Sequence, residues 1–183
     1  MANWKLILLT AALPTAVIAH ANVKSKSGAG GAAVNIYDAM HNHVVPQAQV
    51  IWDITNMAMD DDGNPSEKKM KAADWKRLME STAALSASLN RIASAKALTV
   101  RLANQKLLDE DLPAGAKAAT VQHNINQNSA GFRQYAKALA QYVNRMNRAA
   151  DRRDIKSISE MASELDGQCE GCHETYWFGR GKS

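Results

Sequence analysis

Cysteine is scarce in this chain of 183 residues, which contains only Cys169 and Cys172. A structural zinc site usually needs four ligands, so two thiols would have to borrow histidines from elsewhere in the chain. A thioredoxin-like redox pair would lie between a strand and a helix, and the alternating pattern of a strand is missing around these cysteines. A simple disulfide would not explain the histidine that follows the second cysteine. The pair therefore calls for a different chemistry.

The chain also lacks the charge pattern of a nucleic-acid-binding protein. Its formal net charge is +4, from 22 basic and 18 acidic residues, and the basic residues are scattered without a long run or interleaved aromatic residues. The sequence contains no recognisable Ser-His-Asp set, paired-carboxylate motif or phosphate-binding loop. These absences disfavour nucleic acid as a partner and give no support for an enzyme.

The first 21 residues have the pattern of a secretory signal peptide. Lys5 supplies a basic start, the stretch 6–19 is mainly apolar, and Ala19-His20-Ala21 fits the small-x-small cleavage rule. The apolar stretch is short for a membrane span and is interrupted by Pro14, so a retained membrane anchor is disfavoured. We expect an exported protein.

Residues 22–33 are small and polar and predict a flexible lead-in, which leaves 34–183 as one domain. In that domain, four stretches repeat apolar residues at steps of three and four, the period of an amphipathic helix. They span about 33–57, 67–95, 121–146 and 151–176. Pro46 is expected to bend the first helix, and Ser66 is placed to cap the second. Residues 96–115 show no clear pattern. With no strands and short connections, the fold class is all-α, an antiparallel four-helix bundle.

The last helix carries Cys169-x-x-Cys172-His173, the attachment pattern of a c-type haem. At about 100° per residue, Cys172 lies roughly 60° from Cys169 around the helix, and His173 roughly 40° from Cys169 on the other side. One helical turn can therefore present two thiols and one imidazole on a single face. The motif predicts covalently bound haem, with Cys169 and Cys172 as thioether positions and His173 as an axial iron ligand. Haem attachment outside the cytoplasmic membrane agrees with the export signal.

The order of the helices predicts which other residues lie near the motif. In an up-down-up-down bundle, the end of the fourth helix lies beside the start of the first, the end of the second and the start of the third. The expected wall of a haem pocket is therefore drawn from all three of these helices. Its members are Ile36, Met40, His43, Leu89, Ile92, Val121 and Ile125.

Four helices with one Cys-x-x-Cys-His motif near the C-terminus resemble the class II c-type cytochromes, the cytochrome c′ family and its low-spin relatives. The resemblance covers about 34–178 and implies one haem c held by Cys169 and Cys172, with His173 as the fifth iron ligand. The stretch 40–48 is similar to the first-helix segment of relatives in which a methionine binds the iron. High-spin members of the family leave the sixth position open and bind nitric oxide or carbon monoxide.

Three alternatives exist for the sixth position: Met40, an open or water-bound site, and His43. Met40 lies on the core stripe at the height of His173, and we expect His43 one turn deeper on the same face. His41 and His123 fall off the apolar stripes and are expected in solvent.

The function expected from these features is that of a periplasmic one-electron carrier whose partners are redox proteins. The alternative is a five-coordinate gas-binding protein. Arg101 and Lys106 could reach the haem propionates from the connection between the second and third helices. Trp52 and Trp75 lie near the flanks where relatives pair, so a homodimer is possible, although packing within the chain explains them equally.

The signal pattern predicts that the exported protein begins at Asn22. N-terminal sequencing of the periplasmic fraction measures this directly. A start at Met1 in the membrane fraction would instead indicate an uncleaved anchor.

Overall fold

The structure, a computed structural model, describes residues 31–178, so the expected signal peptide and most of the lead-in lie outside the described residues. Helices dominate it. They are α1 Ile36–Asp38, the π-helix η1 Ala39–Val44, α2 Val45–Met57, the 3-10 helix η2 Glu67–Lys69, α3 Ala72–Ala93, α4 Ala118–Gln127, α5 Ser129–Asp151 and α6 Ile155–Tyr176. Two short strands, β1 Val34–Asn35 and β2 Leu98–Thr99, form a parallel pair. The predicted all-α class is confirmed.

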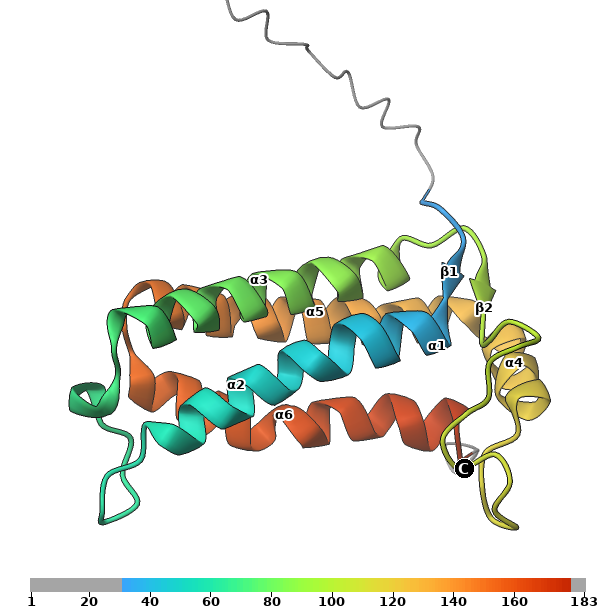
Figure 1. Ribbon diagram of the computed structural model, residues 1–183. Coiled ribbons are helices and arrows are strands. Elements are labelled where there is room, and N and C mark those ends of the chain that lie inside the picture. The colour runs from blue at the N-terminus through green and yellow to red at the C-terminus, as the bar shows by residue number, and fades with distance from the viewer. Residues whose placement is uncertain (1–30, 179–183) are drawn as a thin grey trace, which may run out of the picture.

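Four long helical segments lie side by side and alternate in direction (Figure 1). The α1-η1-α2 segment packs against α3 and α6, and α5 packs against the same two helices. The C-terminal end of α6 therefore lies at the same end of the molecule as η1, the end of α3 and the start of α5 (Figure 1). Helix α4 and the pair of strands cover this end.

The apolar stripes of the helices meet in one core. On α3, six residues at steps of three and four are all buried: Trp75, Leu78, Thr82, Leu85, Leu89 and Ile92. Phe132, Val143 and Met146 of α5 belong to the same core. Burial of one such side chain stabilises the fold by roughly 1.5–3 kcal/mol. Burial of the apolar stripe, which recurs every 3.6 residues, therefore stabilises the helical conformation of these segments.

Side-chain amides and hydroxyls fix the register of α3 against α5. Asn147 Nδ2 donates to Thr82 Oγ1 at 2.7 Å, and Ser86 Oγ donates to Asn144 Oδ1 at 2.8 Å. Sliding one helix along the other would leave these half-buried groups without partners, at a cost of about 1–3 kcal/mol for each.

The turn before Pro46 differs from the expected simple bend. Residues 39–44 form a π-helix, in which the Val45 amide donates to the Met40 carbonyl five residues earlier. Pro46 has no amide to donate and lies in the first turn of α2, where this loss is tolerated. A π-turn inserts extra chain into the helix and changes which residues face inward.

The predicted helix over 121–146 is wrong, because the chain breaks at Asn128 into α4 and α5. Asn128 leaves helical geometry, with φ −143° and ψ 64°, and its Oδ1 accepts a hydrogen bond from the Gly131 amide at 2.9 Å. Asparagine is among the strongest N-cap residues, so Asn128-Ser129 was a usable signal for this break.

The predicted cap at Ser66 is also wrong. Ser66 precedes the short helix η2 and makes no side-chain capping bond, and Met70 is extended before α3 begins. Instead, Asp74 accepts a hydrogen bond from the Lys71 amide at 3.0 Å at the start of α3. The last helix begins at Ile155, about four residues after the expected start, where Asp154 Oδ1 accepts from the Ser157 amide at 3.1 Å.

The segment 96–115 contains β2 and turns. β2 pairs with β1 in the register Val34 to Leu98, which corrects the expectation of no strands. Gly31, at the end of the expected lead-in, forms a bridge with Ala95 and lies so close to the Ser94 carbonyl that a Cβ would collide with it. Within 31–178, no helix is long and apolar enough to cross a membrane.

Replacing Asn128 with Ala is expected to lower the free energy of unfolding by about 1 kcal/mol, because the Gly131 amide loses its capping partner. Urea unfolding of the purified protein measures the change. Gln127→Ala, at the exposed neighbouring position, is the matched control and should change stability by no more than about 0.5 kcal/mol. Equal effects of both substitutions would show that the side chain of Asn128 does not cap α5.

Candidate functional site

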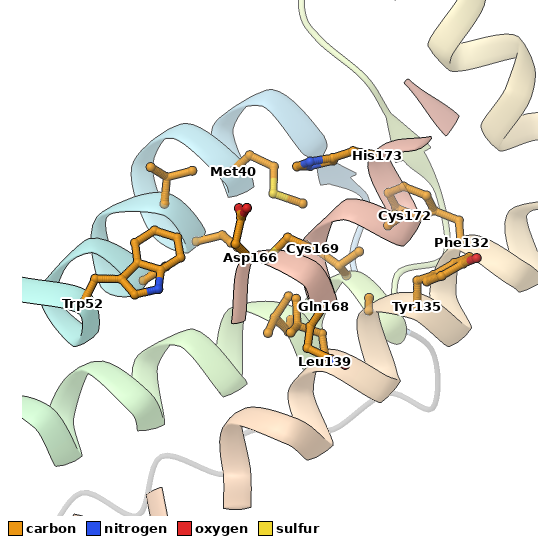
Figure 2. Close-up of a pocket in the computed structure, with 16 residues that line it drawn as sticks. Met40, Trp52, Phe132, Tyr135, Leu139, Asp166, Gln168, Cys169, Cys172 and His173 are labelled. Carbon is orange, nitrogen blue, oxygen red and sulfur yellow. The ribbon is translucent and has the colours of Figure 1, made fainter. Parts of the chain in front are cut away.

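A cavity of about 250 Å³ lies beside the C-terminal half of α6 (Figure 2). Its wall is drawn from four helical segments and is mainly apolar. The residues of the wall are Met40, Val44, Val45, Ala48 and Trp52 of η1 and α2; Leu89 and Ile92 of α3; Phe132, Tyr135, Ala136 and Leu139 of α5; and Asp166, Gln168, Cys169, Cys172 and His173 of α6. Both cysteines and the histidine of the motif therefore line the cavity.

Cys169, Cys172 and His173 lie on one side of α6 and are all half-buried (Figure 2). The spacing of three and one residues in a regular helix produces this common face, as expected from the sequence. The structure thus brings the two thiols and the imidazole to one apolar cavity.

Burial controls the protonation of these groups. It raises the pKa of the Cys172 thiol to about 12, with a smaller contribution from Cys169. It also raises the pKa of the Cys169 thiol to about 11, and the Asp166 carboxylate adds to the rise. The pKa of His173 is lowered by burial, against the opposing effect of Asp166. At neutral pH both thiols are therefore protonated, and burial favours the neutral imidazole, which is the form that binds a metal.

The end of α6 is held by Tyr176, three residues after His173. The Tyr176 side chain is only 2% exposed, and its hydroxyl donates to the Asn128 carbonyl at 3.0 Å. Its ring meets the edge of Phe132 with centroids 5.1 Å apart. Asn124 Nδ2 donates to the Tyr176 carbonyl at 3.0 Å, so α4 also holds this end. These contacts fix the rotation of the motif relative to the cavity.

Gly131 makes room for this anchor. A Cβ at this position would lie 2.8 Å from the Tyr176 hydroxyl and 2.5 Å from Asn128 Nδ2. Neither Tyr176 as an anchor nor this requirement for glycine was found from the sequence, because both depend on a contact between helices far apart in the chain.

Trp177 lies directly against the proposed iron ligand. Its ring centroid is 5.8 Å from that of His173, and its amide donates to the His173 carbonyl at 2.8 Å. The tryptophan limits the rotation of the imidazole and covers part of its surface. The sequence alone gave no sign of this contact.

In the first helical segment, Met40 faces the cavity, whereas His41 and His43 do not. Met40 lines the cavity with His173 (Figure 2). His43 was expected on the same face, and this expectation is wrong: its side chain is 43% exposed and lies 3.8 Å from the Asp38 carboxylate. The π-turn is the reason, because it brings Val44 inward and turns His43 outward. His41 is exposed and stacks on Tyr37, and His123 is exposed, as expected.

Besides His43, three expected members of the wall are missing from it. Leu89 and Ile92 line the cavity as expected. Ile36, Val121 and Ile125 are buried but lie outside the wall. The break at Asn128 moves α4 to the end of the molecule, so α5 supplies its own residues instead. The sequence offered no signal for this exchange beyond the cap at Asn128.

The other candidate residues pair elsewhere. Arg101 forms an ion pair with Glu110 at 3.3 Å, and Lys106 pairs with Asp111, so neither lines the cavity. Trp52 Nε1 donates to the Ala162 carbonyl at 2.9 Å, and Trp75 is 4% exposed in the core. Packing within the chain accounts for both tryptophans.

Comparison with protein families gives one match, to the family described as cytochrome C′, over residues 49–177. The matched segment is well over half of the chain and contains Cys169, Cys172 and His173. The chain belongs to the cytochrome c′ family. As a class II c-type cytochrome, it is a member of a group of haem proteins, and its family implies a haem c cofactor. Neither the curated proteins nor the solved structures gave a significant match.

The residues of this cytochrome fit a haem c group. Two thiols and one imidazole share a face of α6, and the remaining wall is mainly apolar, as a porphyrin requires. Met40 precedes the segment matched by the family, so the family does not decide the sixth iron ligand.

Proposed function

We propose that this cytochrome is a periplasmic carrier of single electrons with one covalently bound haem c. In this proposal Cys169 and Cys172 form the two thioether bonds, and His173 is an axial ligand of the iron. The four long helices form an antiparallel bundle around the haem. When bound, the haem supplies an iron that gains or loses one electron.

The observation that carries this proposal is the position of Met40. Its thioether and the His173 imidazole line the same cavity from different helices (Figure 2). If Met40 and His173 both bound the iron, no position would be left for an external ligand, which would suit electron transfer better than ligand binding. His43 is a weaker candidate, because half-exposed His43 lies beside Asp38 and outside the wall.

The rest of the wall assists in two ways. The apolar side chains of η1, α2, α3 and α5 exclude water from the cavity and favour a haem with little exposed edge. Tyr176 and Trp177 hold α6 and the His173 ring in place, so the ligand moves little when the charge of the iron changes. Small movement keeps electron transfer fast.

The location and the partners follow from the sequence. The signal pattern of residues 1–21 supports export to the periplasm, and the partners are redox proteins that give and accept one electron. Nucleic acid is not an expected partner, and pairing into a homodimer is compatible with the carrier role.

A second candidate function is binding of nitric oxide or carbon monoxide at an open sixth position. It is favoured by the apolar side chains around Met40, among them Val44, which would suit a small apolar ligand. In that case Met40 is a flexible core residue that fills a gap.

Replacing both Cys169 and Cys172 with Ala tests the attachment. The double variant is expected to lose its haem under denaturing conditions and to fold poorly, because an unfilled apolar cavity destabilises a core. Haem-stained denaturing gels measure the bond. Ser163→Ala, on the same helix but outside the wall, is the control and should retain the stain. Haem that stays on the denatured double variant would place the attachment elsewhere.

Replacing Met40 with Leu separates the two functions. Stability should change by less than about 1.5 kcal/mol, because the two side chains have similar volumes. If Met40 binds the iron, the optical spectrum should become high-spin, carbon monoxide should bind, and the reduction potential should fall.

Two further variants complete the test. Met146→Leu, in the core of α5 outside the cavity, should leave the spectrum unchanged. The double variant Met40→Leu, His43→Leu shows whether His43 replaces Met40 as an iron ligand in the single variant. A native protein that is already high-spin and binds carbon monoxide, with a spectrum unaffected by Met40→Leu, would favour the gas-binding function.

A further inference from the structure

A single carboxylate faces the cavity. Asp166 lies on α6 three residues before Cys169 and seven before His173, so it shares their side of the helix, within roughly 60° and 20° of them. The structure places Asp166 in the wall together with all three residues of the motif (Figure 2).

Among residues 31–178, no basic side chain pairs with the carboxylate of Asp166. Asp166 is the only aspartate or glutamate in the described wall, and the wall contains no lysine or arginine. Within residues 31–178, its carboxylate forms no hydrogen bond and no ion pair, unlike Glu110 or Asp154, which are held by neighbouring donors. Asp166 lines the cavity and is also exposed, so water solvates part of its charge.

The field of this carboxylate reaches the site. Asp166 contributes to the raised pKa of the Cys169 thiol, after the larger effect of burial. This contribution has the sign expected of a nearby negative charge, which disfavours a thiolate. A group that fills the cavity displaces water from the inner side of the carboxylate, and the interaction then grows because the local dielectric constant falls.

We propose that Asp166 lowers the reduction potential of the bound haem, because its negative charge lies in the wall of the cavity, is not paired with any basic side chain of residues 31–178, and stabilises ferric over ferrous iron. This inference rests on the proposed haem site. One electron passes between the iron and a protein redox partner, and Asp166 exchanges neither electron nor proton in this step. Asp166 acts only through its electric field and is not a catalytic residue.

The size of the effect follows from the distance along the helix. Seven residues of α6 span about 10 Å. Because Asp166 is exposed, an effective dielectric constant of about 35 to 80 applies, and a unit charge at that distance then changes an equilibrium constant roughly two- to fivefold. Removal of the charge should therefore favour reduction by this factor.

The test uses the haem-loaded protein at pH 7 and measures the midpoint potential by spectroelectrochemical titration. Asp166→Asn, which keeps the shape and removes the charge, should raise the equilibrium constant for reduction roughly two- to fivefold. Asp166→Ala should act in the same direction, which guards against a variant that fails to take up haem. Asp166→Glu retains the charge and should stay near the native value.

Glu170→Gln is the matched control. Glu170 lies on α6 closer in sequence to His173 than Asp166 does, and it is exposed, but it lies outside the wall of the cavity. Water screens such a charge, so its removal should change the equilibrium constant less than twofold.

Different results would contradict the role of Asp166 and the presence of the haem site. A native spectrum in Asp166→Asn with an unchanged potential, or an equal effect of Glu170→Gln, would overturn the role of Asp166 alone. Absence of haem bands from the native protein would overturn the proposed function itself.

Discussion

The hydrogen bond from the Tyr176 hydroxyl to the Asn128 carbonyl joins the two parts of the molecule on which the site depends. At one end of this bond, α6 carries the cysteines and the histidine. At the other end, Asn128 ends α4 and caps α5. Because Tyr176 is buried and its ring contacts Phe132, the hydroxyl is held in position for this bond. The rotation of α6 and the start of α5 are therefore fixed together, and with them the shape of the cavity.

A cavity of this kind is an unstable feature of a helical protein unless it is filled. The wall is mainly apolar, and an empty apolar cavity costs packing energy that the surrounding helices recover only in part. The contacts of α3 with α5 form a complete core further along the molecule, and the polar pairs between these helices are satisfied there. The cavity is thus confined to one end, where filling it by a porphyrin would complete the core.

Two local irregularities decide which side chains meet at this end. The π-turn of η1 brings Val44 inward beside Met40 and leaves His43 near Asp38 in partial contact with solvent. The break at Asn128 turns α4 aside, so Phe132, Tyr135 and Leu139 of α5 form the wall. Single-turn π-helices occur often at functional sites, because an inserted residue re-aims its neighbours. Here it separates the thioether of Met40 from the imidazole of His43.

The sequence by itself determined the all-α class, the extent of the last helix and the common face of Cys169, Cys172 and His173, because these follow from the period of 3.6 residues within one helix. It also determined that Met40 and Ile92 share a wall, since helix order places them at one end. Only the tertiary structure decided that His43 turns outward, that Tyr176 holds the motif and that Asp166 faces the cavity. Those positions depend on a hydrogen-bond shift near Pro46 and on contacts between residues as far apart as Asn128 and Tyr176, and no local pattern encodes either of them.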